Sequence, residues 1–259
     1  MTGAPLLACT GLTVRFGGLT ALNSLDLTIT PGEIVGLIGP NGSGKTTFFN
    51  AVTGLYRVAE GSVVFEGRDL TGFRPQAIYR AGITRTFQRS RLCLPLSVFD
   101  NLMLGNHRNL SQSLVFNLIA RRAFARNVEE NKERARMLLG TFDARLPERM
   151  EQPAGVLGMI DRRRLEVCRA LISQPKLLLL DEPSAGMTHD ETRQLMDDML
   201  LVKSLTPELA IVLIEHEMGV IERVTNRCAV LNYGEKICEG PYGVVSRDAG
   251  VRAAYLGDE

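Results

Sequence analysis

The chain has 259 residues, of which 45% are hydrophobic and 23% are charged, and its 30 basic residues nearly balance its 29 acidic ones. This length allows one large domain or a core with an inserted subdomain, and the composition is ordinary for a soluble globular protein. A net charge of +1 gives no support for broad nucleic-acid binding, and we expect the basic clusters at residues 121–122 and 162–164 to be solvated or ion-paired helix faces. No apolar run approaches the roughly 18 residues of a transmembrane helix, so we expect any membrane role to depend on a partner.

The first 38 residues predict β-strands separated by turns. Residues 6–9 predict the first strand segment, and residues 12–16 predict another that ends at the Gly17-Gly18 turn. Residues 25–29 alternate between apolar and polar side chains. Residues 61–67 predict a further short strand. Together these segments predict a β-rich edge next to the buried strand expected at residues 34–38.

A glycine-rich loop follows the apolar run at residues 34–38, and a segment with helical character begins at Lys45. This order of strand, loop and helix, with the pattern G-x-x-x-x-G-K-[ST], predicts a phosphate-binding P-loop. Glycines can adopt positive φ, so the backbone N–H groups can surround a phosphate oxygen at the positive end of a helix. Lys45 adds a charge for the β- and γ-phosphates, and the Thr46 hydroxyl is placed to bind Mg²⁺. The residues expected to contact the nucleotide are Gly39, Pro40, Asn41, Gly42, Ser43, Gly44, Lys45, Thr46 and Thr47.

Helical signals then replace strand signals for about 60 residues. Ser97 is a suitable N-cap for a helix through Leu104, and we expect further helices at residues 113–122 and 127–142. The apolar spacing of the last helix predicts a buried face at Met137, Leu138 and Phe142.

Core elements resume after this helical stretch. Residues 161–172 predict a helix, and residues 177–180 and 211–214 predict fully buried strands. Residues 228–231 and 236–238 flank a turn sequence and predict a hairpin. Five cysteines without C-x-x-C spacing indicate small buried thiols in a reduced, cytosolic protein.

Alternation of helices and buried strands around a P-loop predicts an α/β fold with a mainly parallel sheet, an antiparallel β edge and an inserted helical subdomain. We expect one domain over residues 1–259, with its core at about residues 1–88 and 165–259 and its helical subdomain at about residues 89–164.

Two carboxylates, Asp181 and Glu182, follow the strand at residues 177–180. Parallel sheets hold ligands at the carboxyl ends of their strands, where one carboxylate can hold Mg²⁺ and the next can polarise a water aimed at the γ-phosphate. An acidic pair at a strand end is more often a turn, but its presence with a P-loop in one chain favours a catalytic site.

The sequence resembles the ATP-binding subunits of ABC transporters over essentially the whole chain. The P-loop and the acidic pair carry the resemblance, together with Thr86-Phe87-Gln88, Ser184-Ala185-Gly186-Met187, Ile214-Glu215-His216 and Phe16. The resemblance implies that the protein is an ATPase and that two such cassettes close on two ATP molecules with Mg²⁺.

The resemblance also implies a role for each site residue. The catalytic residues would be Glu182, His216, Gln88 and Lys45, with Glu182 polarising the water and His216 contacting the γ-phosphate. Thr46, Gln88 and Asp181 would bind Mg²⁺, and Phe16 would stack on adenine. The residues alone leave open that Phe16 is core, Gln88 a solvated loop amide and His216 a structural histidine.

The chain departs from the family at its signature segment, which comprises Leu157, Gly158, Met159, Ile160 and Asp161. In the family this segment reads Leu-Ser-Gly-Gly-Gln and contacts the γ-phosphate bound by the opposite cassette. Gly158 has no hydroxyl, and the β-branched Ile160 replaces a glycine that lets the backbone approach the phosphate. We therefore expect intact ATP-binding residues but a weak signature, which favours a heterodimer with a second cassette over a homodimer.

Within the family, several segments resemble the branched-chain amino-acid import ATPases: residues 15–22, 84–92, 107–142, 181–186, 232–237 and 254–257. This resemblance implies two transmembrane permease subunits, an extracytoplasmic solute-binding protein, no nucleic acid and a position on the cytoplasmic face of the membrane. A lipopolysaccharide-export ATPase, a urea or short-amide importer and a soluble ABC ATPase that acts on ribosomes or DNA remain alternatives.

Overall fold

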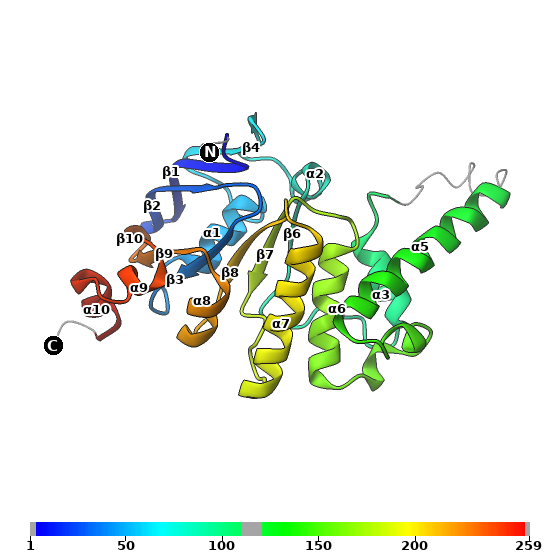
Figure 1. Cartoon of the computed structure of the whole chain (residues 1–259). Helices are drawn as coiled ribbons and strands as arrows, with labels where there is room; N and C mark the ends of the chain where they lie inside the picture. Colours follow the sequence, from blue (N-terminus) through cyan, green and yellow to red (C-terminus); the bar gives the residue numbers. More distant parts are fainter. Residues whose placement is uncertain (1–3, 110–120, 257–259) are drawn as a thin grey trace. The chain divides into compact units, whose positions relative to one another are not determined.

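The computed structural model describes residues 4–109 and 121–256 (Figure 1). The contacts divide the chain into two compact units. The first unit comprises Met1–Arg85, Lys176–Pro183 and Thr206–Glu259, and the second comprises Thr86–Pro175 and Ser184–Leu205. The second unit extends beyond residues 89–164, the range predicted for the helical subdomain. The boundaries of that subdomain stay a prediction.

The first unit contains an antiparallel sheet with the strand order β2-β1-β4-β5. The two segments predicted at residues 6–9 and 12–16 belong to one strand, β1, which stays paired past Gly11 through shifts in its register. Leu25, Leu27 and Ile29 are buried, which confirms the predicted alternation. The strands are β1 (Leu7–Phe16), β2 (Leu19–Ile29), β4 (Glu60–Phe65) and β5 (Arg68–Asp69).

A second sheet in this unit has the order β10-β9-β3-β8-β7-β6 (Figure 1). All pairs except β10 with β9 are parallel, as the sequence predicts. Every residue of β3, β7 and β8 is buried, because strands inside a parallel sheet are covered on both faces. The strands are β3 (Ile34–Ile38), β6 (Ile83–Arg85), β7 (Leu177–Asp181), β8 (Ala210–Ile214), β9 (Arg227–Asn232) and β10 (Glu235–Gly240).

Short helices complete the first unit. The sequence analysis found only the first of them, since helices of one or two turns carry too few residues for a clear 3.6-residue pattern. Phe48 and Phe49 of α1 are fully buried and anchor that helix. The helices are α1 (Lys45–Val52), α2 (Pro75–Ala81), α8 (Met218–Val224), α9 (Tyr242–Val245) and α10 (Ala249–Leu256).

The second unit is helical among its described residues. Ser97 caps the first of its helices as predicted, because its Oγ accepts a 3.0 Å hydrogen bond from the Asp100 N–H. No described helix of the chain combines the length and apolar character that crossing a membrane requires. The helices are α3 (Val98–Gly105), α5 (Arg121–Phe142), α6 (Met159–Leu171) and α7 (His189–Leu205), with 3₁₀ turns at Pro147–Arg149 and Ala154–Val156.

Helix α5 corrects part of the sequence prediction. Met137 was expected on its buried face but is 67% exposed, whereas Ala135, Leu139 and Phe142 are buried. The buried face of α5 also includes the polar Asn131, whose Oδ1 accepts a 2.7 Å hydrogen bond from Asn106. Because this face contains a polar residue, the apolar pattern alone predicts a face that is shifted by about one residue from the observed one. Of the helix predicted at residues 113–122, residues 113–120 lie outside the described residues, as do the side chains of the basic pair at 121–122.

All five cysteines are free thiols. Cys9, Cys168 and Cys228 are buried as predicted, but Cys93 is exposed and Cys238 is partly exposed. Cys93 precedes Ser97 in a segment without regular structure.

Candidate functional site

The predicted P-loop joins the end of β3 to the start of α1. Gly39 has φ 144°, and a Cβ at this position would lie 2.0 Å from the Leu231 carbonyl oxygen. Gly44 caps α1 with φ 105°, and a Cβ there would lie 2.8 Å from the Ala21 carbonyl oxygen. Both positions therefore require glycine, because a side chain would meet backbone and would strain a left-handed conformation.

The turn between β9 and β10 holds the same loop from outside. Gly234 donates its N–H to the Ser43 carbonyl at 3.0 Å, and its own carbonyl accepts from the Asn23 N–H at 2.9 Å. The sequence predicts this hairpin but gives no sign that its tip contacts the P-loop. Backbone hydrogen bonds thus tie the hairpin tip to the loop.

Lys45 lies inside the loop that it follows. Its Nζ donates to the carbonyl oxygens of Gly39 at 2.7 Å and Pro40 at 2.8 Å, and the side chain is buried. Burial lowers the pKa of Lys45, while the charges of Glu182 and Asp181 act in the opposite direction. The ammonium group is therefore close enough to the predicted catalytic Glu182 and the predicted Mg²⁺ ligand Asp181 to feel both charges.

Strand register brings Glu182 and His216 together. Asp181 of β7 pairs with Ile214 of β8, and each candidate residue follows its strand directly or after one residue. The Glu182 N–H donates to the Ile214 carbonyl at 3.0 Å, and Glu182 Oε1 lies 2.8 Å from His216 Nε2. Side-chain exposure is 16% for Glu182 and 50% for His216, so His216 is not a buried structural histidine.

Glu182 also has an unusual backbone, with φ 47°. A left-handed conformation is uncommon for a residue other than glycine and costs on the order of 1 kcal/mol. The turn that it makes redirects the chain at the end of β7 and points the carboxylate at His216.

Asp181 has a partner that the sequence analysis did not find. Its side chain is 3% exposed, and its Oδ2 accepts from Arg85 Nη2 at 2.6 Å; Arg85 also donates to Asn50 of α1. Burial raises the pKa of Asp181, and the Arg85 guanidinium opposes that shift. The sequence feature that could have indicated this partner is the basic residue Arg85 at the end of β6. That strand pairs with β7 but is too short to predict from the sequence.

An aromatic pair lies at the end of β1. The Phe16 and Tyr56 ring centroids are 5.0 Å apart at an interplanar angle of 82°. Phe16 is 45% exposed and Tyr56 is 38% exposed, so Phe16 is not a core residue. Tyr56 is an addition to the predicted set, and an exposed aromatic pair offers the kind of surface on which a purine stacks.

The oxygen atoms near the P-loop suit Mg²⁺. Thr46 supplies a hydroxyl and Asp181 a carboxylate, and both are hard donors. No group of three or more histidine, cysteine, aspartate or glutamate side chains gathers into a metal site in the described part of the chain.

Gln88 belongs to the second unit, where its side chain is exposed. The Gln88 carbonyl accepts a 3.4 Å hydrogen bond from Arg163 Nη2. Arg163 Nη2 also donates to the Ala185 carbonyl at 3.1 Å. Arg163 also pairs with Glu166 at 2.9 Å. Arg163 therefore links the backbone of the Gln88 segment to residues 184–187 and is an ion-paired, largely buried side chain rather than a solvated one.

The signature segment begins helix α6. Gly158 is the N-cap with φ −66° and ψ 171°, and a Cβ there would meet no atom within 4 Å. Leu157 is buried, Met159 is 52% exposed, and Ile160 lies in the first helical turn. Compared with the serine of the family signature, Gly158 therefore lacks a hydroxyl, although the structure has space for a serine side chain at this position.

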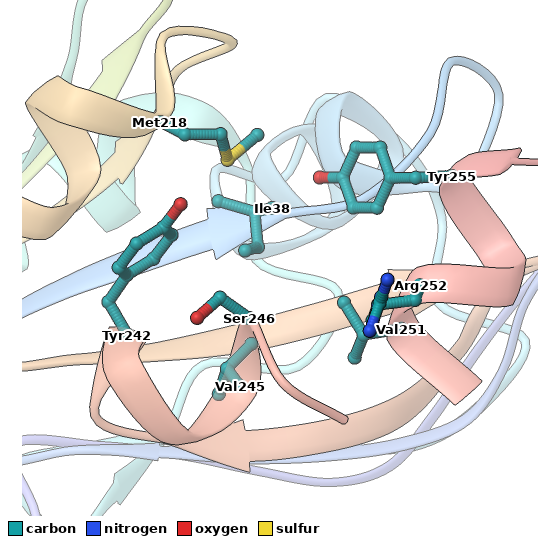
Figure 2. A pocket seen from close by; sticks show the side chains of 8 residues that line it. All are labelled: Ile38, Met218, Tyr242, Val245, Ser246, Val251, Arg252 and Tyr255. Carbon is teal, nitrogen blue, oxygen red and sulfur yellow. The ribbon is translucent and has the colours of Figure 1, made fainter. Parts of the chain in front are cut away.

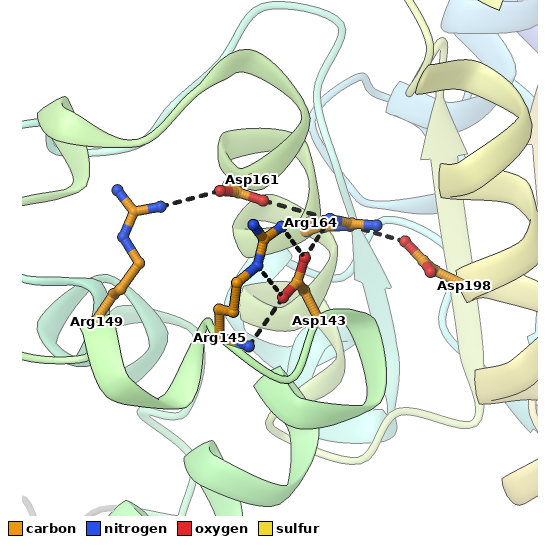
Figure 3. Close-up of polar contacts among 6 residues, drawn as sticks. All are labelled: Asp143, Arg145, Arg149, Asp161, Arg164 and Asp198. Carbon is orange, nitrogen blue, oxygen red and sulfur yellow. Dashed lines mark hydrogen bonds and ion pairs between the residues drawn. The ribbon is translucent and has the colours of Figure 1, made fainter. Parts of the chain in front are cut away.

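Arg164 holds this segment through its side chain (Figure 3). Its guanidinium lies 2.8 Å from Asp198, 3.2 Å from Asp143 and 3.4 Å from Asp161, which also pairs with Arg149 at 3.1 Å. Hydrogen bonds from Arg145, and the charges of Arg145 and Arg164, hold the pKa of Asp143 far below its usual range. Burial raises the pKa of Asp198, against the effect of Arg164.

Comparison with known proteins agrees with this geometry. The model of the ABC transporter family matches residues 22–185. The chain is 39% identical over 254 residues to the high-affinity branched-chain amino acid transport ATP-binding protein LivG of Salmonella typhimurium, with 98% of each chain covered. It is 36% identical over 257 residues to the corresponding protein BraF of Pseudomonas aeruginosa, again with 98% of each chain covered.

Solved structures give the same result. A nucleotide-free ATP-binding cassette from an ABC transporter superposes with a TM-score of 0.83 at 28% identity, covering 98% of this chain and 100% of that one. The ADP conformation of an ABC transporter cassette gives a TM-score of 0.83 at 27% identity, covering 99% and 100%. The chain therefore belongs to the ABC transporter family, as one of its ATP-hydrolysing, ATP-binding cassettes.

Proposed function

We propose that this cassette energises the import of branched-chain amino acids or related small polar solutes. Its support is the similarity over 98% of the chain to transport proteins for branched-chain amino acids. The geometric observation that carries the hydrolytic part is the 2.8 Å contact between Glu182 and His216 at adjacent strand ends.

Each of these side chains has a chemical task in the proposed reaction. The Glu182 carboxylate accepts a proton from the attacking water, and His216 Nε2 orients that carboxylate and faces the γ-phosphate. Lys45 leaves the carbonyls of Gly39 and Pro40 for the β- and γ-phosphates, which carry more charge.

The remaining site residues bind rather than react. P-loop residues 39–47 surround the phosphates through backbone N–H groups, and Phe16 stacks on adenine with Tyr56 beside it. Thr46, Asp181 and Gln88 would hold Mg²⁺, which would neutralise phosphate charge. Arg85 is a positioning residue, since it fixes the Asp181 carboxylate at the end of β7.

The partners follow from the signature segment and from the resemblance to import ATPases. Gly158 cannot donate a hydroxyl hydrogen bond to a nucleotide in an opposite cassette, so we propose a second, non-identical cassette with an intact signature. Two permease subunits would carry the solute across the membrane, with the cassettes on its cytoplasmic face, and an extracytoplasmic protein would deliver it.

The first test is steady-state Mg-ATP hydrolysis by the purified chain and by Glu182→Gln, with bound nucleotide measured in parallel. Removing a positioned general base lowers turnover by about 10²–10⁴-fold, while ATP binding is expected to persist. Glu130→Gln is the matched control, because its exposed carboxylate on α5 pairs only with Arg126 in the described structure, at 3.7 Å. Measurable and equal turnover in wild type and Glu182→Gln would remove Glu182 from the mechanism, whereas ATP binding without turnover in both would point to a partner cassette that must supply the signature.

The transported solute needs a separate measurement. Cells that lack this chain are expected to lose uptake of radiolabelled leucine, and wild type but not Glu182→Gln is expected to restore it. Restored uptake of urea without leucine uptake would replace the amino-acid proposal while leaving the ATPase assignment intact.

A further inference from the structure

The first unit contains a cavity of about 300 Å³ whose lining residues have no role in the reaction described above (Figure 2). Its walls come from Ile38 at the end of β3, Met218 at the start of α8, and the helices α9 and α10. Two buried valines, Val245 and Val251, form part of its lining. The volume lies at the lower end of the range for small-molecule sites, and the lining is mostly apolar as in such sites.

A few polar groups line this apolar cavity. Arg252 of α10 is exposed, and the described residues supply no hydrogen bond or ion pair to its guanidinium. Ser246 and Tyr242 also line the cavity, and each carries a hydroxyl (Figure 2). The carboxylate closest in sequence, Asp248, caps α10 by accepting from the Val251 N–H at 2.9 Å.

The lining is continuous with the nucleotide-binding loop. Ile38 directly precedes Gly39, and Met218 follows His216 by two residues. Burial raises the pKa of the Tyr255 phenol, and a hydrogen bond with the Gly39 backbone acts in the opposite direction. A molecule in the cavity would therefore touch Ile38, which directly precedes the P-loop, and Met218, which lies two residues after His216.

We propose that this cavity binds a small organic carboxylate with a branched apolar body, and that its occupation changes the affinity of the P-loop for nucleotide. The apolar lining suits a hydrocarbon group of a few carbons, and the Arg252 guanidinium suits a carboxylate, which it can bind through two parallel hydrogen bonds. A neutral ligand of the same shape would leave the guanidinium without its ionic partner.

Binding is tested on the nucleotide-free protein with 4-methylpentanoate, and with 4-methylpentanamide as its neutral counterpart. Titration calorimetry is expected to give saturable binding of the carboxylate with a Kd on the order of 1 mM, and binding of the amide at least about tenfold weaker. Arg252→Gln is expected to weaken carboxylate binding about tenfold. Arg247→Gln is the matched control, since Arg247 is exposed nearby but does not line the cavity.

Several outcomes would overturn the binding site. They are no saturable binding of 4-methylpentanoate, equal binding of the amide, and equal loss in the Arg252 and Arg247 variants. The assay involves no ATP turnover, so its result is independent of the proposed hydrolytic function.

The effect on nucleotide is measured as the Kd of ADP with and without saturating 4-methylpentanoate. We expect a change of roughly fivefold in either direction, and ADP must change the Kd of 4-methylpentanoate by the same factor. Tyr255→Phe keeps the ring but removes the hydroxyl at Gly39, so it is expected to bind the carboxylate while showing a smaller change in ADP affinity. An ADP Kd that does not change on saturation would overturn the link to the P-loop.

Discussion

The nucleotide-binding site of the first unit and the signature segment of the second are built in different ways. Backbone hydrogen bonds place Gly39, Glu182 and His216, through the register of parallel strands and the contact of Gly234 with Ser43. Side-chain ion pairs fix the signature segment, since Asp161 is held by Arg149 and Arg164. A backbone framework tolerates the loss of most single side chains, whereas a network around one guanidinium does not.

The largest effect is expected from Arg164→Met. This change leaves Asp143, Asp161 and Asp198 without the buried cation that they share. Removing one partner of a buried ionic network costs about 3–5 kcal/mol of unfolding free energy, which urea denaturation followed by circular dichroism can measure. Arg145→Met is the control, because its side chain is 83% exposed and surface pairs contribute about 0–1 kcal/mol. Similar losses in both variants would contradict the central role of Arg164.

Gly39→Ala tests the P-loop, which backbone contacts hold in place. The new Cβ would lie 2.0 Å from the Leu231 carbonyl oxygen, so the P-loop backbone must move. We expect ADP affinity to fall by about 100-fold or more, roughly 2.7 kcal/mol, in a fluorescence titration. In Gly42→Ala no atom lies within 4 Å of the new Cβ, and only the cost of φ 80°, about 1 kcal/mol, remains. Equal affinities of the two variants would show that the contact with Leu231 does not shape the site.

This difference in construction also explains what the sequence could predict. Strand, loop and helix around residues 34–47 are local in sequence, so the P-loop could be predicted from its pattern alone. The proximity of Glu182 and His216 could also be predicted, because each residue comes at the end of an apolar strand and both strands are assigned to one parallel sheet.

Other contacts join residues far apart in the chain without a local pattern. Arg85 reaches Asp181 from a strand of three residues, and Arg163 binds the carbonyls of Gln88 and Ala185. Met137 was wrongly expected to be buried, since the buried face of α5 includes the hydrogen-bonded Asn131. Periodicity detects apolar faces and cannot detect a buried amide that has its partner on another helix.

A smaller effect is expected from Asp143→Asn, which removes one charge from the ionic network. The folded state holds the pKa of Asp143 far below the unfolded value of about 3.9, so its ionised form stabilises the fold above that value. This stability is lost as pH falls through the folded pKa. We therefore expect Asp143→Asn to unfold at lower urea than wild type at pH 7, by about 1 kcal/mol, and the difference to shrink below about pH 4. A difference that stays constant between pH 7 and pH 3 would contradict a role for its charge.

The smallest effect on stability, and the sharpest test of the comparison, is expected from Gly158→Ser. The backbone of Gly158 is already extended and a Cβ meets no atom within 4 Å, so serine fits, and as an N-cap it changes unfolding free energy by only a few tenths of a kcal/mol. If the missing hydroxyl weakens the signature, one added hydrogen bond of about 1 kcal/mol should raise Mg-ATP turnover of the chain alone about fivefold. Gly158→Ala fits equally well but has no hydroxyl, and it is expected to leave turnover unchanged. Equal turnover of the serine and alanine variants would mean that Ile160 or Asp161, rather than the absent hydroxyl, limits the segment.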